Sequence, residues 1–284
     1  MSAVFHKATG SGNDFVMFDG RTTSDADWPP ERIVRICDRR DGIGGDGLVI
    51  VTPLGDNTVR MTFFNADGSR AAMCGNAALC TTRFAAAMEM ADPAGMTLVT
   101  DAGSFGARCV GSEGGALAEL HLPDAPVPVP ASVELGEGEQ SISLGTIGVP
   151  HLVTVVDDVA AVDVAERGRI QRFHPGCGSG GANANFVSRI SPSSGTGGAA
   201  NPAAPTWALR TYERGVEGET LACGTGTVAA ALVLATAGLD QLPLRFRSAS
   251  GRVLTVNAQI SDGVAHDIWL CGEGRLVARG VWLG

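Results

Sequence analysis

Two cysteines stand out because each is followed by glycine at the expected start of an alanine-rich helix. Cys74 opens the stretch CGN, and Cys223 opens the stretch CGTG. A thiol at a helix N-terminus lies close to unpaired backbone N–H groups and to the positive end of the helix dipole, which lowers its pKa toward neutrality. The same N–H groups bind carboxylates, and the glycine lets a ligand approach the backbone. Each stretch therefore predicts an acid–base thiol beside an anion site.

Two such thiols together predict the inversion of a stereocentre without a cofactor. One base removes a proton from one face of a carbon atom, and an acid returns a proton to the opposite face. A thiolate and a thiol can exchange these roles, so the reaction runs in both directions. The ordinary thiol pKa of about 8.5, lowered locally, suits proton transfer near neutral pH. The helix N-termini would stabilise the charge that develops as the carbanion forms.

Motifs for other chemistries fail or are absent from the sequence. GIGGDG (42–47) and GCGSGG (176–181) match the dinucleotide pattern, but each continues into an expected strand where a helix is required. The sequence has no Walker lysine pattern, no HExxH and no CxxC, and its histidines lack metal-ligand spacing. Pyridoxal chemistry needs a Schiff-base lysine, and the single lysine, Lys7, lies beside a terminal strand. We therefore expect no cofactor and no metal.

Six motifs together resemble the diaminopimelate epimerase family. They are GSGNDF (10–15), GIGGDGL (42–48), FNADGS…CGN (64–76), GVPH (148–151), NANFV (183–187) and YERG…ETLACGTG (212–226). They follow the family's order across essentially the whole chain. The resemblance implies a cofactor-independent isomerase of lysine and peptidoglycan precursor biosynthesis that interconverts LL- and meso-diaminopimelate. It also implies an α+β fold of two pseudo-symmetric lobes, each a mostly antiparallel sheet wrapped around a central helix, with the active site in the cleft between them.

The resemblance also assigns roles to individual residues. Cys74 and Cys223 are the two acid–base thiols. The residues after each thiol would bind the reacting α-carboxylate: Gly75, Asn76, Gly224 and Thr225. The remaining substrate-binding residues would be Asn13, Asn65, Asn183, Glu213 and Arg214. Arg214 would hold the distal carboxylate in a bidentate fork, and Glu213 would contact the amine. His151 and Glu213 are implied as supporting acid–base groups beside the thiols.

From the residues alone, other interpretations stay open. Asn13 and Asn65 also fit turn positions, His151 fits a capped turn after proline, and Glu213 with Arg214 fits a surface ion pair. The other cysteines are expected to be structural: Cys37, Cys80, Cys109, Cys177 and Cys271.

Three positions depart from the family pattern. Val149 stands where many members have Asn, Gly47 stands where some have Gln, and ERGVEGET has one more residue between Arg214 and Glu219 than the commonest spacing. Val149 keeps open a cofactor-independent racemase of another amino acid on the same fold, although Arg214 would then be left without a second carboxylate. A related isomerase of this fold that lacks one or both thiols, or a non-catalytic binding protein, is disfavoured by the presence of both thiols.

Short strands bounded by turn residues must position these motifs. Strands are expected at 4–8, 14–18, 47–52, 58–64, 97–100, 105–110, 116–122, 141–144, 151–156, 184–190, 206–212, 244–247, 252–257, 265–271 and 275–282. Helices are expected at 30–39, 75–90 and 224–237, and a solvated loop at 191–206. DGSRAAMCGNAALC (67–80) matches EGETLACGTGTVAAAL (217–232), and GNDFVMFDG (12–20) matches GVPHLVTVVDD (148–158), which predicts a duplicated unit. A proline- and acid-rich stretch follows Pro123, so we expect an N-terminal lobe at 1–123, completed by strand 275–284, and a C-terminal lobe at 124–274.

The amino-acid composition restricts the class of binding partner. The 284 residues carry a net charge of −9, with a pI near 5.0, which argues against nucleic acid or an anionic membrane. The first residues lack a basic region leading into an apolar one, no apolar run reaches about 18 residues, and the seven cysteines are an odd number. We expect a cytoplasmic enzyme with a small amino-acid substrate, and the sequence leaves a homodimer open.

Overall fold

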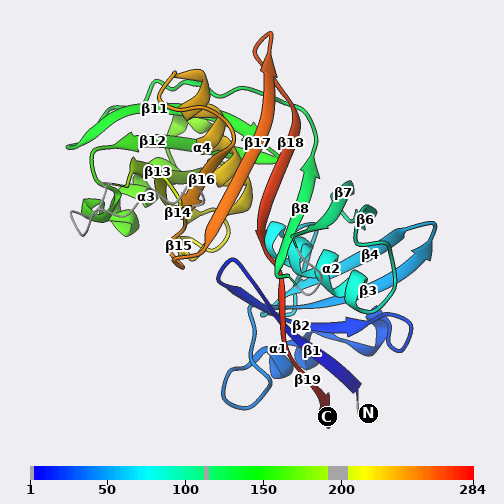
Figure 1. Ribbon diagram of the computed structural model, residues 1–284. Helices are drawn as coiled ribbons and strands as arrows, with labels where there is room; N and C mark the ends of the chain where they lie inside the picture. Colours follow the sequence, from blue (N-terminus) through cyan, green and yellow to red (C-terminus); the bar gives the residue numbers. More distant parts are fainter. Residues whose placement is uncertain (1–2, 112–114, 191–203) are drawn as a thin grey trace, which may run out of the picture. The chain divides into compact units, whose positions relative to one another are not determined.

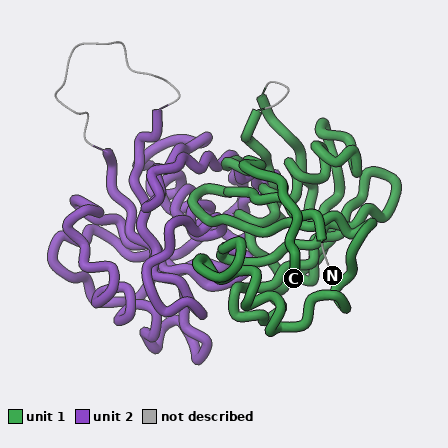
Figure 2. Tube along the Cα trace, turned by 90° about the horizontal axis from the view of Figure 1, so that it is seen from below, with its two compact units in different colours: residues 1–122, 271–284 green, residues 123–270 purple. Residues whose placement is uncertain are grey.

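The structure is a computed structural model that describes residues 3–111, 115–190 and 204–284. The chain divides into two compact units, which Figure 2 distinguishes by colour. Unit 1 comprises residues 1–122 and 271–284, and unit 2 comprises residues 123–270. Most of the stretch 191–206, expected as a solvated loop, lies outside the described residues.

Unit 1 consists of short strands around a buried helix, α2. In chain order (Figure 1) its elements are β1 (Ala3–Gly10), β2 (Asn13–Asp19), η1 (Asp25–Asp27), α1 (Pro30–Cys37), β3 (Gly47–Gly55), β4 (Thr58–Asn65), β5 (Arg70–Ala71), α2 (Gly75–Ala87), β6 (Met96–Thr100), β7 (Gly103–Val110), β8 (Leu117–Leu122) and β19 (Arg275–Trp282). Most strand pairs are antiparallel, but β2–β3 and β4–β6 are parallel. Parallel neighbours need a crossover, and α1 and α2 lie in these two connections.

Unit 2 repeats this plan. Its elements are β9 (Ala125–Pro126), β10 (Val129–Pro130), β11 (Glu139–Ile147), β12 (Val149–Val156), η2 (Val159–Ala161), α3 (Val164–Arg172), η3 (Pro175–Cys177), β13 (Asn183–Arg189), β14 (Trp207–Glu213), β15 (Gly218–Thr220), α4 (Gly224–Thr236), β16 (Leu244–Arg247), β17 (Val253–Ser261) and β18 (Val264–Glu273), whose last residues belong to unit 1. The parallel pairs are β12–β13 and β14–β16, with α3 and α4 in their connections.

The order of pairings is therefore the same in both units. Each has an antiparallel pair, a parallel crossover, a second antiparallel pair, a short strand and a helix that begins directly after a cysteine. The predicted α+β class and the predicted duplication into two pseudo-symmetric halves, each wrapped around a central helix, are confirmed.

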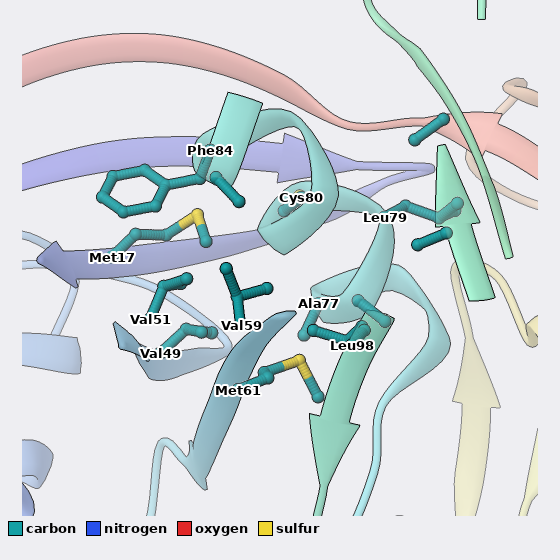
Figure 3. Packing of buried hydrophobic residues seen from close by; sticks show 14 of the residues in the cluster. Met17, Val49, Val51, Val59, Met61, Ala77, Leu79, Cys80, Phe84 and Leu98 are labelled. Atoms are coloured by element: carbon teal, nitrogen blue, oxygen red, sulfur yellow. The ribbon is translucent and has the colours of Figure 1, made fainter. Parts of the chain in front are cut away.

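Helix α2 is central in unit 1 because its residues are small enough to be buried on nearly every side. Its side chains pack on Met17, Val59 and Met61 from the surrounding strands (Figure 3). Thr81 and Thr82 bury their hydroxyls by donating to the carbonyls one turn earlier, at 2.8 and 2.9 Å. In unit 2, the stretch GTGTVAAALVLAT of α4 is apolar or small almost throughout and is likewise buried.

Helix α3 was not expected from the sequence. Gly168 in its centre and a mostly polar composition conceal it, although Asp163 caps its first turn by accepting from the Glu166 N–H at 3.0 Å. Gly168 is needed because a Cβ there would lie 2.5 Å from the Tyr212 side chain. The stretch after Pro123 also contains two short strands, β9 and β10, rather than linker alone.

Candidate active site

Cys74 is the N-cap residue of α2 in unit 1. Its backbone is extended, with φ −142° and ψ 119°, and its carbonyl accepts the first helical hydrogen bond from Ala78 at 2.9 Å. The thiol is half-buried. A Cβ at Gly75 would meet no atom within 4 Å, so there is open space beside the first turn of the helix. A ligand carboxylate can therefore approach the N–H groups that begin α2.

Asn13 and Asn76 lie against this turn and hold each other. Asn76, which is buried, donates to Asn13 Oδ1 at 2.7 Å, and Asn13 donates to Asp46 Oδ2 at 2.9 Å. Asp46 also accepts from the Asp14 backbone N–H at 3.1 Å and from Arg39 at 2.8 Å. Asp46 thereby fixes which end of the Asn13 amide faces Asn76. The sequence does not indicate this role, because Asp46 lies within GIGGDG, which matches the dinucleotide pattern.

An ion-pair network extends from this point and uses the single lysine. Lys7 lies 2.5 Å from Asp14 and also donates to the Gly44 carbonyl, and Arg39 lies 2.6 Å from Asp14. Burial acts to raise the pKa of Asp14, but the hydrogen bonds from Arg39 and Lys7 outweigh it and hold that pKa below its usual range. The single lysine is therefore part of a structural ion pair with Asp14.

Asn65 lies at the end of β4, level with the start of β3. The registers Phe15↔Gly47 and Gly47↔Asn65 bring the starts of β2 and β3 and the end of β4 to the same edge. Asn65 donates to the Ser69 hydroxyl at 3.0 Å, so its amide is part of a turn as well as a candidate ligand. Glycine at 47 has a steric reason, because a Cβ would lie 2.4 Å from the Phe64 carbonyl oxygen.

Cys223 has the matching position in unit 2, as the N-cap residue of α4. Its backbone is again extended, with φ −124° and ψ 108°, and its carbonyl accepts from the Thr227 N–H at 3.0 Å and hydroxyl at 2.8 Å. The residue is 6% exposed. Its sulfur lies 3.8 Å from the Thr225 hydroxyl oxygen. Gly224 follows, and a Cβ there would lie 2.8 Å from the Leu270 side chain.

Three adjacent strands bring the remaining candidates of unit 2 to one edge. His151 of β12 is level with Asn183 of β13, which adjoins the end of β14 where Glu213 and Arg214 lie. The Asn183 side-chain oxygen accepts from the Arg214 backbone N–H at 2.7 Å. Val149 begins β12 and is half-buried. The structure therefore brings these four sequence-predicted residues together.

The charges of this cluster follow from burial. His151 is completely buried, and burial together with the Arg214 charge lowers its pKa to about 3, with the Ile147 carbonyl acting in the opposite direction. The imidazole is therefore neutral at physiological pH. Burial also raises the pKa of Glu213, against the opposing effect of the Thr220 hydroxyl.

Arg214 and Glu213 do not form the surface ion pair that the sequence left open, and within the described part of the chain neither forms a salt bridge with another residue, although the Arg214 charge is close enough to Glu217 to help lower the pKa of that carboxyl. The guanidinium lies against Gly180, in the glycine-rich stretch that had matched the dinucleotide pattern. The extra residue in ERGVEGET lies in a turn held by Glu217, which pairs with Arg172 at 2.9 Å and accepts from the Gly215 N–H at 3.0 Å.

Four of the other cysteines are unsuited to acid–base work. Burial raises the pKa values of Cys37 (to about 11), Cys80, Cys109 and Cys177. Among the described residues, no group of three or more His, Cys, Asp or Glu side chains is placed to hold a metal ion. The helices of the described ranges are also too short or too polar to cross a membrane.

Comparison with known proteins gives a consistent result. The sequence model of the family described as Diaminopimelate epimerase matches residues 5–115 and 144–267. A diaminopimelate epimerase from Gemmatimonas aurantiaca is 42% identical, covering 97% of this chain and 98% of that protein. One from Aquifex aeolicus is 36% identical, covering 96% and 97%. Among solved structures, a phenazine biosynthesis protein of the PhzF family from Bacillus anthracis has a TM-score of 0.72 at 15% identity, covering 100% of both chains, which supports the fold.

Proposed function

The chain belongs to the diaminopimelate epimerase family, and we propose that it interconverts LL- and meso-2,6-diaminopimelate by proton transfer at the α-carbon between Cys74 and Cys223. It is an isomerase. The proposed reaction serves lysine and peptidoglycan precursor biosynthesis, and the substrate is a small amino acid. The acidic charge and the cysteine content support a cytoplasmic location without a nucleic-acid or membrane partner.

One observation carries the proposal: the two thiols occupy the same place in two units of the same topology. Each is the extended N-cap residue of a buried helix, directly after a short strand. One thiolate takes the α-proton, and the other thiol donates a proton to the opposite face. The roles reverse for the opposite direction, so no cofactor is needed. The N–H groups at the helix starts would stabilise the carboxylate as charge develops on it.

The charged ends of the substrate have candidate partners. We assign the α-carboxylate to the helix starts, at Gly75 with Asn76 and at Gly224 with Thr225. The distal carboxylate is assigned to Arg214, whose guanidinium forms no salt bridge within the described residues and whose acidic neighbour, Glu217, is paired with Arg172.

The remaining assignments are supporting ones. Asn13, Asn65 and Asn183 would bind the polar groups of the substrate, and Glu213 its amine. Glu213 and the neutral His151 would also support the thiols during proton transfer. A neutral imidazole and a carboxyl group of raised pKa suit this work, because the imidazole can exchange hydrogen bonds with a thiol without adding a charge, and the raised pKa makes the carboxylate a better proton acceptor.

The direct test is solvent deuterium incorporation at the α-carbon. LL-diaminopimelate should exchange and epimerise, whereas monocarboxylic amino acids should not. Exchange with another amino acid and none with diaminopimelate would select the racemase alternative, which Val149 keeps open.

Replacing either Cys74 or Cys223 by Ala should lower the epimerisation rate by at least about a hundredfold, because each direction needs both a base and an acid. Cys109→Ala is the matched control and should retain the wild-type rate. Full activity in either active-site variant would reject the two-base mechanism.

A further inference from the structure

Asn185 is a fully buried polar side chain to which no role has been given above. It lies in β13, and both ends of its carboxamide are hydrogen-bonded. Its Oδ1 accepts from the Thr211 hydroxyl at 2.9 Å. Its Nδ2 lies 2.9 Å from the Leu152 carbonyl oxygen, 3.2 Å from His151 Nδ1 and 3.4 Å from the Asn183 carbonyl oxygen. The amide therefore links three strands at the edge where the candidate residues of unit 2 gather.

The Leu152 carbonyl determines which way the amide points. A carbonyl oxygen can only accept, so the amide atom that faces it must be the nitrogen. The same nitrogen faces His151 Nδ1. An amide nitrogen only donates, so Nδ1 must be the unprotonated nitrogen of the ring. Because the imidazole is neutral, its single proton then resides on Nε2.

His151 Nε2 is itself buried and makes no hydrogen bond of normal geometry to the described residues, and the Ile147 carbonyl is the backbone acceptor close enough to the ring to act on its pKa. Keeping a donor buried without a partner costs free energy, and native proteins retain such groups mainly where function requires them. A substrate or a reacting group can supply an acceptor of better geometry than the Ile147 carbonyl. The Asn185 amide thus keeps His151 neutral at Nδ1 and leaves its N–H donor, Nε2–H, on the side of the ring away from Asn185.

The same carboxamide also lies against the first turn of α4. A Cβ at Gly226 would lie 2.2 Å from Asn185 Oδ1 and 3.1 Å from Cys223 Sγ. The space left by this glycine is therefore bordered on one side by the amide and on the other by the thiol. A shift of the amide would be transmitted to the turn that carries Cys223.

We propose that Asn185 is a positioning residue for the reaction: its carboxamide holds His151 as the Nε2–H tautomer and supports the first turn of α4 below Cys223. This inference rests on the proposed function in one respect, the assignment of Cys223 as an acid–base thiol. The tautomer itself does not depend on that assignment.

The test is ¹⁵N NMR of the histidine-labelled full chain, with assignment of His151 from a His151→Gln spectrum. In the wild type, Nδ1 of His151 should resonate as an unprotonated nitrogen and Nε2 as a protonated one. Asn185→Asp replaces the amide donor by a carboxylate acceptor, so Nδ1 of His151 should become protonated in this variant. A protonated Nδ1 in the wild type, or an unchanged tautomer in Asn185→Asp, would overturn the proposal.

Kinetics supply the second measurement. Asn185→Asp should lower kcat for diaminopimelate about tenfold or more while changing KM less than about threefold, because the amide is not assigned to the substrate. The matched control is Gln171→Leu, which removes a fully buried amide bonded to Thr154 at 3.0 Å and should leave both the tautomer and kcat unchanged. An equal loss of kcat in both variants would mean that Asn185 has only a general structural role. If wild-type protein shows no exchange with diaminopimelate, the proposed function fails, and the NMR result still decides the tautomer.

Discussion

At the scale of single residues, Arg214 differs from the other arginines of its neighbourhood. Arg210 pairs with Glu219 at 2.7 Å and Arg172 with Glu217 at 2.9 Å. The Arg214 guanidinium has no such partner in the described ranges. The acidic group that the Arg214 charge affects, Glu217, is already paired with Arg172, so a half-buried guanidinium without a salt bridge of its own fits a site whose carboxylate arrives with the ligand.

Arg214→Gln should therefore lower kcat/KM for diaminopimelate by roughly 10- to 150-fold, since a charge-assisted hydrogen bond contributes about 1.5–3 kcal/mol. Arg210→Gln is the matched control, because Arg210 lies on β14, which ends just before Arg214, and already has Glu219 as its ion-pair partner. This variant should change kcat/KM less than about threefold. The measurement is kcat/KM for diaminopimelate from steady-state kinetics of both variants. A larger effect in the control would place the distal carboxylate elsewhere.

His151 makes a prediction about stability and pH. Its pKa is about 3 in the folded chain, against 6.5 for the unfolded reference, so between these values only the unfolded chain binds the proton. The stabilisation is complete above pH 6.5 and is lost as pH falls toward 3, by up to about 1.4 kcal/mol per pH unit. Urea unfolding between pH 7 and about 5 should show this slope in the wild type and a shallower one in His151→Gln. Parallel slopes would mean that the ring is not buried in its neutral form.

The sequence pointed to the residues proposed to carry the chemistry but not to those that position them. Cys74 and Cys223 could be recognised because a thiol before glycine at a helix start has a physical consequence of its own. Asp46 and Asn185 act only through contacts between distant segments, with Asn13 in one case and Thr211 in the other. An Asn between the apolar residues Ala184 and Phe186 of a strand was the available signal for Asn185.

At the scale of elements, α2 reaches its position because two glycines allow close approach. A Cβ at Gly10 would lie 2.6 Å from the Asn76 carbonyl oxygen and 2.8 Å from Cys80 Sγ, and one at Gly274 would lie 2.4 Å from the Leu79 carbonyl oxygen. The helix is therefore placed by the backbones of β1 and of the turn before β19. The thiol at its start depends on that placement.

Gly10→Ala should consequently lower the free energy of unfolding by about 1–3 kcal/mol, the usual cost of overpacking a tight contact. It should also lower epimerase activity, because Asn76 must move. Gly95→Ala is the control, since a Cβ there meets nothing within 4 Å. Urea titration compares the two, and equal midpoints would show that α2 tolerates displacement.

Helix prediction succeeded for α2 and α4, where a run of small apolar residues is itself the signal, and for the amphipathic α1, whose apolar residues are spaced along one face. Helices α1, α2 and α4 were expected and are present, ending within three residues of the predicted positions. Helix α3 was missed on local composition, yet the duplication predicted from the sequence implies it, because α1 occupies the same crossover between parallel strands in unit 1. The repeat was a stronger signal than the propensity of nine residues.

At the scale of the whole molecule, unit 2 is a continuous stretch of chain and unit 1 is not. Residues 1–122 are completed by residues 271–284, which supply β19. Strand β19 pairs with β1 from Ala3↔Trp282 to Thr9↔Arg275. Trp282 joins the core cluster that contains Phe5 and Ile33 and is 8% exposed. In unit 2, β11 is paired at the corresponding edge by the short strand β10.

Unit 1 should therefore be unstable until the end of the chain has been added. Truncation after Gly274 removes the partner of β1, and loss of Trp282 alone should cost about 3 kcal/mol or more in the free energy of unfolding. Truncation after Trp282 removes only the exposed Leu283 and Gly284 and should leave the unfolding midpoint unchanged. Urea unfolding followed by hydrogen exchange should show lost protection in β1 and β2 of the shorter chain, with unit 2 still protected. Retained protection of β1 would mean that residues 1–122 hold their fold without β19.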